Sequence, residues 1–295
     1  MTNETKNIHN ALRQTRLKLG SFSLSGFSIS GLATYHLMPE LNFAVDLGEC
    51  PLSAIPLDNV FLTHAHGDHS RCLMRHHSLR KMTGIAKDAT YYLPEFLCEK
   101  ATNWIKAEAL FENVPEHKFR PPKLVGMKNH ERLKLDRKDL ALEAFEVKHS
   151  IPAMGCTLYR FKKKLKPEFL GKEPGEIIEL RKKGVEVTSD VYEPQISFMG
   201  DCKIESLREN LEVFNSEVVV TECTFVEDSD ADMAGAKSHT HLNDIVKLLE
   251  ELGPGAKCKT LVLNHFSMKY SEKQILSNIE AKLPEAWKEK VKVLL

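Results

Sequence analysis

The sequence lacks the features that would place it in a membrane or in an oxidising compartment. No apolar run approaches the roughly eighteen residues that a transmembrane helix requires, and residues 1–18 hold no apolar stretch of secretory type. The seven cysteines are scattered and form no Cys-x-x-Cys pair, which is typical of reduced thiols. We therefore expect a cytoplasmic protein without a membrane partner.

The chain also has no net charge. Lysine and arginine together number 41, as do aspartate and glutamate, so any contact with nucleic acid must come from a local patch. The sequence shows no short-period repeat and no low-complexity linker. A chain of 295 residues could form one large α/β domain or two smaller ones, and we expect a single domain over residues 1–295.

What the chain does contain is a mixture of short apolar runs and amphipathic stretches. The apolar runs predict strands at 41–47, 59–63, 140–149, 156–161, 185–188, 195–200, 217–223, 259–265 and 291–295. Helical periodicity predicts helices at 70–81, 94–111, 176–183, 204–214, 242–252 and 272–283, with Thr240 or Asn243 as the cap of the fifth. Several neighbouring strands have no helix between them, which favours mixed sheets with helices outside.

Residues 64–69 (HAHGDH) hold three imidazoles and a carboxylate directly after an apolar run. Side chains of an extended backbone alternate between faces, so His64 and His66 point the same way, and Gly67 lets the chain turn before Asp68 and His69. Two such pairs of ligands suit two adjacent divalent metals, and the absence of thiolates favours a catalytic zinc site. The alternative is a solvated histidine-rich turn.

Three further candidates each stand at the carboxyl end of a predicted strand: His149, Asp201 and His265. Strand ends bring distant residues together on a rigid scaffold, and a carboxylate such as Asp201 can bridge two cations. The alternatives are an ordinary histidine, a turn-forming aspartate and a buried core histidine, respectively. Seven other histidines lack this position, and we expect most of them at the surface: His9, His36, His76, His77, His117, His130 and His241.

Residues 160–184 form a basic segment. They hold nine lysines and arginines against four glutamates, a net charge of +5. Such a run is commonly a solvated mixed-charge surface, and the alternative is a short excursion that binds the phosphate backbone of a nucleic acid. The candidate contacts are Lys162, Lys163, Lys164 and Lys166. Aromatic residues are few in this segment, so we expect recognition of shape rather than base stacking.

The chain resembles a known family, the metallo-β-lactamase superfamily, and within it the short form of ribonuclease Z, the tRNA 3′-processing endonuclease. The resemblance runs from about residue 26 to residue 270. It rests on the stretches 45–51 (VDLGECP), 62–69 (LTHAHGDH), 149–155 (HSIPAMG), 198–201 (FMGD), 221–225 (TECTF), 238–241 (SHTH) and 265–270 (HFSMKY). The histidine motif identifies the superfamily, whereas the last two stretches and residues 162–187 are similar to ribonuclease Z.

The resemblance implies a four-layer αββα sandwich and assigns residues to a site with two Zn²⁺ ions, for which Mn²⁺ and Fe²⁺ are alternatives. It implies that His64, His66 and His149 hold one ion, that Asp68, His69 and His265 hold the other, and that Asp201 bridges them. It further implies that Asp46 supports the ligands from behind, and that His239 acts as proton donor near the leaving group, with Asp68 as base on the attacking side. Without the resemblance, His239 is equally well interpreted as a surface histidine before a helix.

We therefore expect a zinc-dependent endoribonuclease that removes the 3′ trailer from precursor tRNA and acts as a homodimer. The alternative enzyme is a small-molecule metallohydrolase of the same fold, such as a phosphodiesterase, lactonase or thioesterase, and a third reading is a non-catalytic RNA-binding relative. The chain departs from the family at Cys156, Cys202 and Ser238, the last of which stands where glycine is usual. The segment between His149 and Asp201 is also shorter than the tRNA-gripping arm of bacterial forms.

Overall fold

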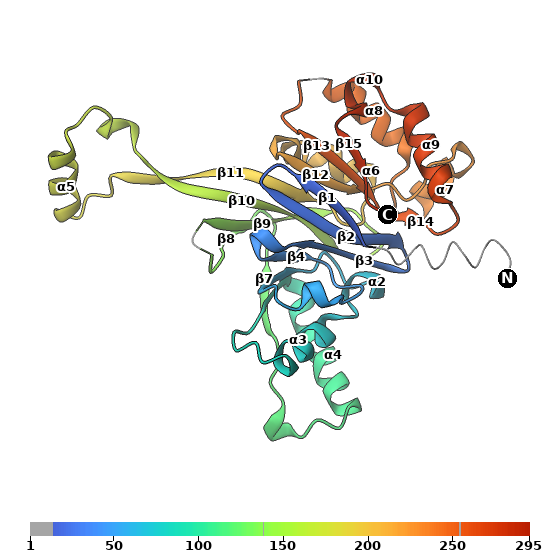
Figure 1. Ribbon diagram of the computed structural model, residues 1–295, viewed down its shortest axis with the longest axis horizontal. Coiled ribbons are helices and arrows are strands. Elements are labelled where there is room, and N and C mark those ends of the chain that lie inside the picture. The colour runs from blue at the N-terminus through green and yellow to red at the C-terminus, as the bar shows by residue number, and fades with distance from the viewer. Residues whose placement is uncertain (1–13, 138, 254) are drawn as a thin grey trace.

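The computed structural model describes residues 14–137, 139–253 and 255–295, so that His9 lies outside the described residues. Two mixed β-sheets pack face to face, and helices cover the outer face of each (Figure 1). This confirms the predicted αββα sandwich. None of the helices in the described ranges combines the length and the apolar character that crossing a bilayer requires.

The first sheet has the strand order β1-β2-β3-β4-β5-β6-β7, with β14 paired to β2. Its strands are β1 (Thr15–Leu19), β2 (Phe22–Ser30), β3 (Ala33–Met38), β4 (Phe43–Val45), β5 (Asn59–Phe61), β6 (Thr90–Pro94), β7 (Lys123–Met127) and β14 (Phe266–Ser267). The pairs from β1 to β4 are antiparallel and those from β4 to β7 are parallel. Helices α3 (Leu73–Met82) and α4 (Cys98–Phe111) lie beside this sheet (Figure 1).

The second sheet has the order β15-β13-β12-β11-β10-β9-β8. Its strands are β8 (Arg132–Lys134), β9 (Leu140–Val147), β10 (Ala153–Leu165), β11 (Thr188–Phe198), β12 (Val218–Glu222), β13 (Thr260–Asn264) and β15 (Val291–Val293). Its helices are α6 (Ile204–Glu209), α8 (Leu242–Leu252), α9 (Glu272–Lys282) and α10 (Glu285–Lys288), while the short helices α2 (Gly67–Ser70) and α7 (Ala231–Ala236) lie in loops.

The core explains why the sheets stack. Apolar side chains from the inner faces of both sheets form one buried cluster, among them Phe61, Leu142 and Phe198. Two further clusters join each sheet to its own helices. Burying each large apolar side chain contributes about 1.5–3 kcal/mol, so these three layers of contact hold the strand ends at fixed positions.

Several sequence-based boundaries are wrong. Strands β1 to β3 were not predicted; in β2 the serines and Gly26 hide a strand that is mostly buried on both faces. The predicted helix 70–81 is interrupted between α2 and α3, and 204–214 ends its α-helical part at Glu209 and continues as a 3-10 turn. The cap of α8 is neither Thr240 nor Asn243 but His241, whose side chain accepts the Asn243 N–H.

A long arm, here residues 161–192, projects from the second sheet (Figure 1). Pairing of β10 with β9 ends at Arg160 and Leu140, and beyond it β10 pairs only with β11, from Phe161–Tyr192 to Leu165–Thr188. Helix α5 (Pro174–Lys182) lies at its tip. The expected excursion over 160–184 is therefore only part of the projection, since the returning strand β11 belongs to it.

Candidate metal centre

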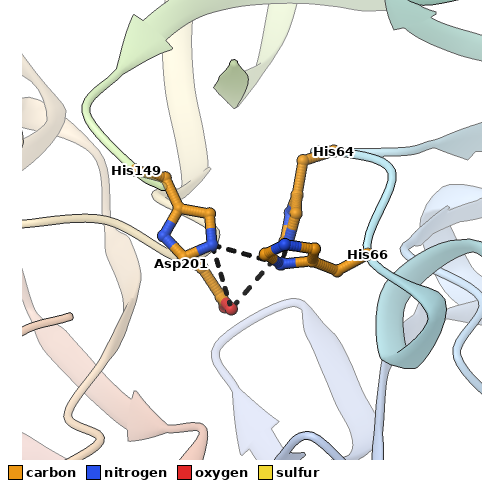
Figure 2. A group of neighbouring side chains, drawn as sticks. All are labelled: His64, His66, His149 and Asp201. Carbon is orange, nitrogen blue, oxygen red and sulfur yellow. Dashed lines mark hydrogen bonds and ion pairs between the residues drawn. The ribbon is translucent and has the colours of Figure 1, made fainter. Parts of the chain in front are cut away.

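The seven candidate ligands meet in one place. His64 and His66 follow β5, Asp68 and His69 lie in α2, and the others follow β9, β11 and β13: His149, Asp201 and His265. Figure 2 shows His64, His66 and His149 converging with Asp201. We call these seven residues the ligand cluster. The structure therefore brings together residues that are up to 201 positions apart in the chain, from His64 to His265.

The first group has the spacing of a single metal site. His66 Nδ1 lies 3.1 Å from His64 Nε2 and 3.2 Å from His149 Nε2. Asp201 Oδ2 lies 3.9 Å from His64 Nε2 and 4.0 Å from His149 Nε2. Ligands of a tetrahedral zinc, each about 2.0–2.1 Å from the ion, are about 3.3 Å apart. These four residues therefore fit a zinc ion.

The second group lies on the other side of Asp201. His69 Nε2 is 3.4 Å from His265 Nε2, and Asp68 Oδ2 is 3.7 Å and 3.6 Å from these two nitrogens. Asp201 approaches the same pair, with Oδ1 3.3 Å from His69 and Oδ2 3.2 Å from His265. Its carboxylate thus lies between the two groups, as a bridging ligand requires. The donor set of imidazoles and carboxylates suits divalent zinc, manganese or iron.

Most of the ligand imidazoles have a hydrogen-bond partner on their second ring nitrogen. His69 Nδ1 contacts Asp46 Oδ2 at 2.8 Å, and His64 Nδ1 contacts Thr63 Oγ1 at 2.9 Å. Thr63 in turn donates its backbone N–H and its hydroxyl to Asp46. His149 Nδ1 lies 3.1 Å from the Ser238 carbonyl oxygen. Such contacts fix the tautomer and the ring orientation of a metal-binding histidine.

The protonation states favour ligation. Burial lowers the pKa of His64, His66 and His149, so these rings are neutral, as a ligand must be. Burial also opposes the charge on Asp201, but His265 and His69 hold the pKa of this carboxyl well below its usual range. His69 differs: burial lowers its pKa, yet Asp201 and Asp46 outweigh burial and raise the pKa well above the ordinary value. Metal binding there must displace a proton.

The backbone around the cluster is unusually constrained. Asp46, Ser238 and His265 have φ of 61°, 61° and 59°, in the left-handed region that ordinary side chains avoid. Gly48 is required for another reason, because a Cβ there would lie 1.7 Å from the Asp68 carbonyl oxygen. Strained backbone of this kind is often found at functional sites, where surrounding contacts hold it in place.

His239 lies beside the cluster, and the structure supplies a partner for it that the sequence analysis missed. Its Nδ1 is 2.9 Å from Oε1 of Glu222, the last residue of β12. Glu222 also accepts hydrogen bonds from the backbone of Cys202 and Thr240 and from the Thr224 hydroxyl. The sequence held only a weak signal: Glu222 is next to last in the strand predicted at 217–223, close to the kind of position that His149, Asp201 and His265 occupy.

Glu222 also connects His239 to the ligands. The Thr224 hydroxyl donates to Glu222 Oε2 at 2.5 Å and lies 3.1 Å from Nδ1 of His265. Burial lowers the pKa of His239, but the Glu222 carboxylate outweighs burial and raises that pKa above its ordinary value. The side chain of His239 also lies with those of Asp201 and His265, whose potential ligand atoms are within 4.8 Å of one another and of one of its ring nitrogens, so His239 is placed directly beside the ligand cluster.

Comparison with known proteins places the chain. A family described as the β-lactamase superfamily domain matches residues 46–266. The protein tRNase Z TRZ1 of Arabidopsis thaliana is 31% identical over 280 residues, which cover 92% of this chain and 95% of the relative. The chain belongs to the tRNase Z family of the β-lactamase superfamily. This confirms the resemblance that the motifs indicated.

Solved structures support the fold of this tRNase Z family member. The metallo-β-lactamase fold protein YhfI of Bacillus subtilis matches with a TM-score of 0.56 and 13% identity, over 90% of this chain and 92% of that chain. Human tRNase Z, short form, matches with a TM-score of 0.51 and 16% identity, over 92% and 88%.

The other histidines correct an expectation. His36, His76, His77 and His241 are buried, whereas His117 and His130 are exposed, so most of those described are not at the surface. His76 shows why: its ring contacts the Tyr91 hydroxyl at 2.7 Å and the Ala54 carbonyl oxygen at 3.0 Å. A histidine whose two nitrogens find partners can be buried without being a ligand.

The arm is less basic than the sequence analysis suggested. Lys162 Nζ lies 2.6 Å from Glu193, and Lys163 Nζ lies 3.9 Å from Asp190, both in the returning strand. Over residues 160–193 nine lysines and arginines face seven acidic residues, a net charge of +2. Within the described part of the chain, no carboxylate lies within 4.0 Å of the ammonium of Lys164 or Lys166.

Proposed function

We propose that this tRNase Z family member is an endoribonuclease that cuts precursor tRNA at the 3′ end and leaves a 3′-hydroxyl on the tRNA. One observation carries the proposal: two groups of metal ligands share Asp201, and His239, whose Nδ1 contacts the Glu222 carboxylate, lies beside them. The level of identity to tRNase Z TRZ1, over nearly the full length of both chains, supports the choice of substrate.

We further propose that the site holds two zinc ions. His64, His66 and His149 would hold one, Asp68, His69 and His265 the other, and Asp201 would contact both. When bound, such a pair of ions eases the deprotonation of water near neutral pH and stabilises the charge on phosphoryl oxygens. Equilibrium dialysis followed by elemental analysis should find two metals per chain, and one metal at full occupancy would contradict this assignment.

The chain's own residues then handle the protons. Asp68 accepts the Gly31 N–H at Oδ2, at 2.8 Å, and His265 and His69 overcome burial to hold the pKa of Asp68 below its usual range. Asp68 therefore stays ionised, as the group that receives a proton from the attacking water must be. As the new P–O bond forms, the bond from phosphorus to the tRNA 3′ oxygen breaks, and His239 gives its Nε2 proton to that oxygen.

The arm would bind RNA at a distance from this chemistry. Strand β10 begins beside His149 and runs away from it for 13 residues, about 40 Å at the usual rise of about 3.3 Å per residue. Lys164 lies near the far end of that strand, and Lys166 follows its last residue. We propose that they contact phosphates of the tRNA body while the 3′ end occupies the ligand cluster.

The test is to incubate the protein with a 3′-extended precursor tRNA and to map the new ends. A single cut with a 3′-hydroxyl on the tRNA fragment is expected, and it should vanish when the metal is removed by chelation and return on adding Zn²⁺. A protein that hydrolyses only small phosphodiesters or lactones, with the precursor left intact, would refute the proposal.

Three secondary expectations belong to the same proposal. We propose a single domain over residues 1–295, supported by the core that both sheets share. We propose a homodimer, supported by the exposed Leu110 and Phe111 at the end of α4, and light scattering would test it. We propose a cytoplasmic location, supported by the seven free cysteines, and localisation of a tagged protein would test it.

A further inference from the structure

The root of the arm contains a cluster of cations and aromatic rings that the proposed chemistry does not use. It consists of Arg132 and Lys134 on the edge strand β8, Tyr159 and Phe161 on β10, and Tyr192 on β11. We call it the arm-root cluster. It stands where the sheet narrows from four strands to two, because β9 stops pairing with β10 at Arg160.

Arg132 is packed against two rings at once. Its guanidinium carbon lies 4.2 Å from the ring centre of Tyr159 and 4.5 Å from that of Tyr192. The two rings stand at 90° to each other, with their centres 6.2 Å apart. Arg132 is held in this position by Glu143 of the neighbouring strand, which accepts from Nε at 2.8 Å and from Nη2.

Lys134 repeats the arrangement one step further along the arm. Its ammonium lies 4.7 Å from the ring centre of Phe161 and forms an ion pair with Asp190 on β11. Phe161 in turn packs on Tyr192, with ring centres 5.6 Å apart. A strand that does not enter the arm therefore contacts both strands of the arm.

A two-stranded ribbon is marginally stable by itself and can twist and bend freely. The contacts of β8 with β10 and β11 oppose such motion at the point where the arm leaves the sheet. The guanidinium of Arg132 already has its carboxylate and both rings, so we argue for a role within the protein and not for direct stacking on a base.

We propose that Arg132 and Lys134 are positioning residues, which fix the direction of the arm and so set the affinity for a large RNA substrate. This inference rests on the proposed function, because it concerns how the arm presents its phosphate contacts. A small substrate that does not contact the arm should be hydrolysed equally well whatever the direction of the arm. If the arm samples other directions, the affinity for RNA falls in proportion to the fraction of molecules whose arm points in the direction that binds RNA.

The experiment compares Arg132→Gln, Arg132→Lys and a control, Arg208→Gln, which removes a similar exposed pair between Arg208 and Glu251 far from the arm. Arg132→Gln should raise KM for precursor tRNA about three- to tenfold, leave kcat within about twofold, and not change turnover of a small phosphodiester. Arg132→Lys keeps the charge but has no planar group to lie against two rings, so it should retain most of the increase in KM. The control should behave as the parent.

Hydrogen exchange supplies a second measurement that does not depend on the substrate. In Arg132→Gln the amides that pair β10 with β11 beyond Phe161 and Tyr192 should exchange faster, while those of β12 and β13 stay unchanged. In a Lys164→Ala/Lys166→Ala background, Arg132→Gln should add little to KM.

Unchanged KM and exchange in Arg132→Gln, or full restoration by Arg132→Lys, would overturn the inference. Should the parent fail to cleave precursor tRNA, the proposed function fails with it, whereas the exchange data still decide whether Arg132 stiffens the arm.

Discussion

The ligand cluster and the arm contrast in how their charges are used. In the cluster the imidazoles and carboxylates are buried or half-buried, and the second ring nitrogens of His64, His69 and His149 have hydrogen-bond partners. In the arm the charged groups are exposed, and carboxylates of the opposite strand face several of the lysines. Buried charges interact strongly and depend on geometry, whereas exposed pairs contribute about 0–1 kcal/mol and are screened by salt. The ligand cluster therefore suits catalysis, which depends on geometry, whereas the arm suits an electrostatic attraction that salt can weaken.

The bridge at Asp201 is where we expect the largest effect. Asp201→Ala removes the carboxylate that both ligand groups share, so the protein should lose both metals or hold them weakly. Activity on any phosphodiester should fall by about 10³-fold or more, because charge stabilisation of several kcal/mol is lost. Metal content and turnover should be measured on the same sample. A variant that keeps two metals and full activity would show that the bridging residue is misassigned.

His239 should matter for the proton and not for the metals. His239→Ala should keep the metal content and lower kcat on precursor tRNA by about 10²–10⁴-fold, the usual range of acid–base assistance. With a nitrophenyl phosphodiester the loss should be much smaller, because that leaving group needs no proton. The control is His241→Asn, which can still accept the Asn243 N–H at the start of α8. Equal losses on both substrates, or loss of metal, would contradict the assignment.

Glu222 should change the pH dependence more than the rate. The acid His239 must be protonated, so kcat falls as pH rises through its pKa, and Glu222 holds that pKa above the ordinary value. Glu222→Gln removes the negative charge, lowers the pKa of His239, and should move the alkaline limb of the kcat profile to lower pH. At neutral pH the loss should be about 10–10²-fold, as for other groups that orient an active residue. An unmoved alkaline limb would mean that Glu222 only supports the fold.

How much could be predicted from the sequence differs between the same two regions. The family and the αββα fold followed from motifs whose residues are close in the chain, such as 62–69, and from strands whose ends carry His149, Asp201 and His265. Glu222 was missed because a glutamate near a strand end carries no distinctive pattern. Its role depends on a contact with His239, which is seventeen residues away in the chain. The cap at His241 was missed for a similar reason, since histidine is not a usual cap.

The arm was misjudged for a different physical reason. Its charge was counted over 160–184, a window that ends before Glu186, Asp190 and Glu193. An antiparallel hairpin brings residues of the second strand beside those of the first, so Lys163 pairs in register with Asp190. Charge summed along the chain therefore overstates the field around a hairpin, and the strand that returns must be counted with the strand that leaves.

The smallest effect that we predict concerns the lysines of the arm. Lys162 and Lys163 are matched by Glu193 and Asp190, whereas Lys164 and Lys166 have no such partner among the described residues. Lys164→Ala/Lys166→Ala should therefore raise KM for precursor tRNA by several-fold and reduce the slope of log KM against log salt by about one to two units, since each phosphate contact contributes roughly one. Lys162→Ala/Lys163→Ala, the matched control with the same change in charge, should have a smaller effect, because these two lysines are already near carboxylates: Lys162 pairs with Glu193, and Lys163 lies near Asp190, which also pairs with Lys134. Both variants should hydrolyse a small phosphodiester as the parent does. Equal effects of the two double variants would mean that RNA binding depends on the net charge of the arm and not on which lysines have a carboxylate nearby. All four lysines would then contribute alike, and the arm would differ from the ligand cluster in the exposure of its charges alone.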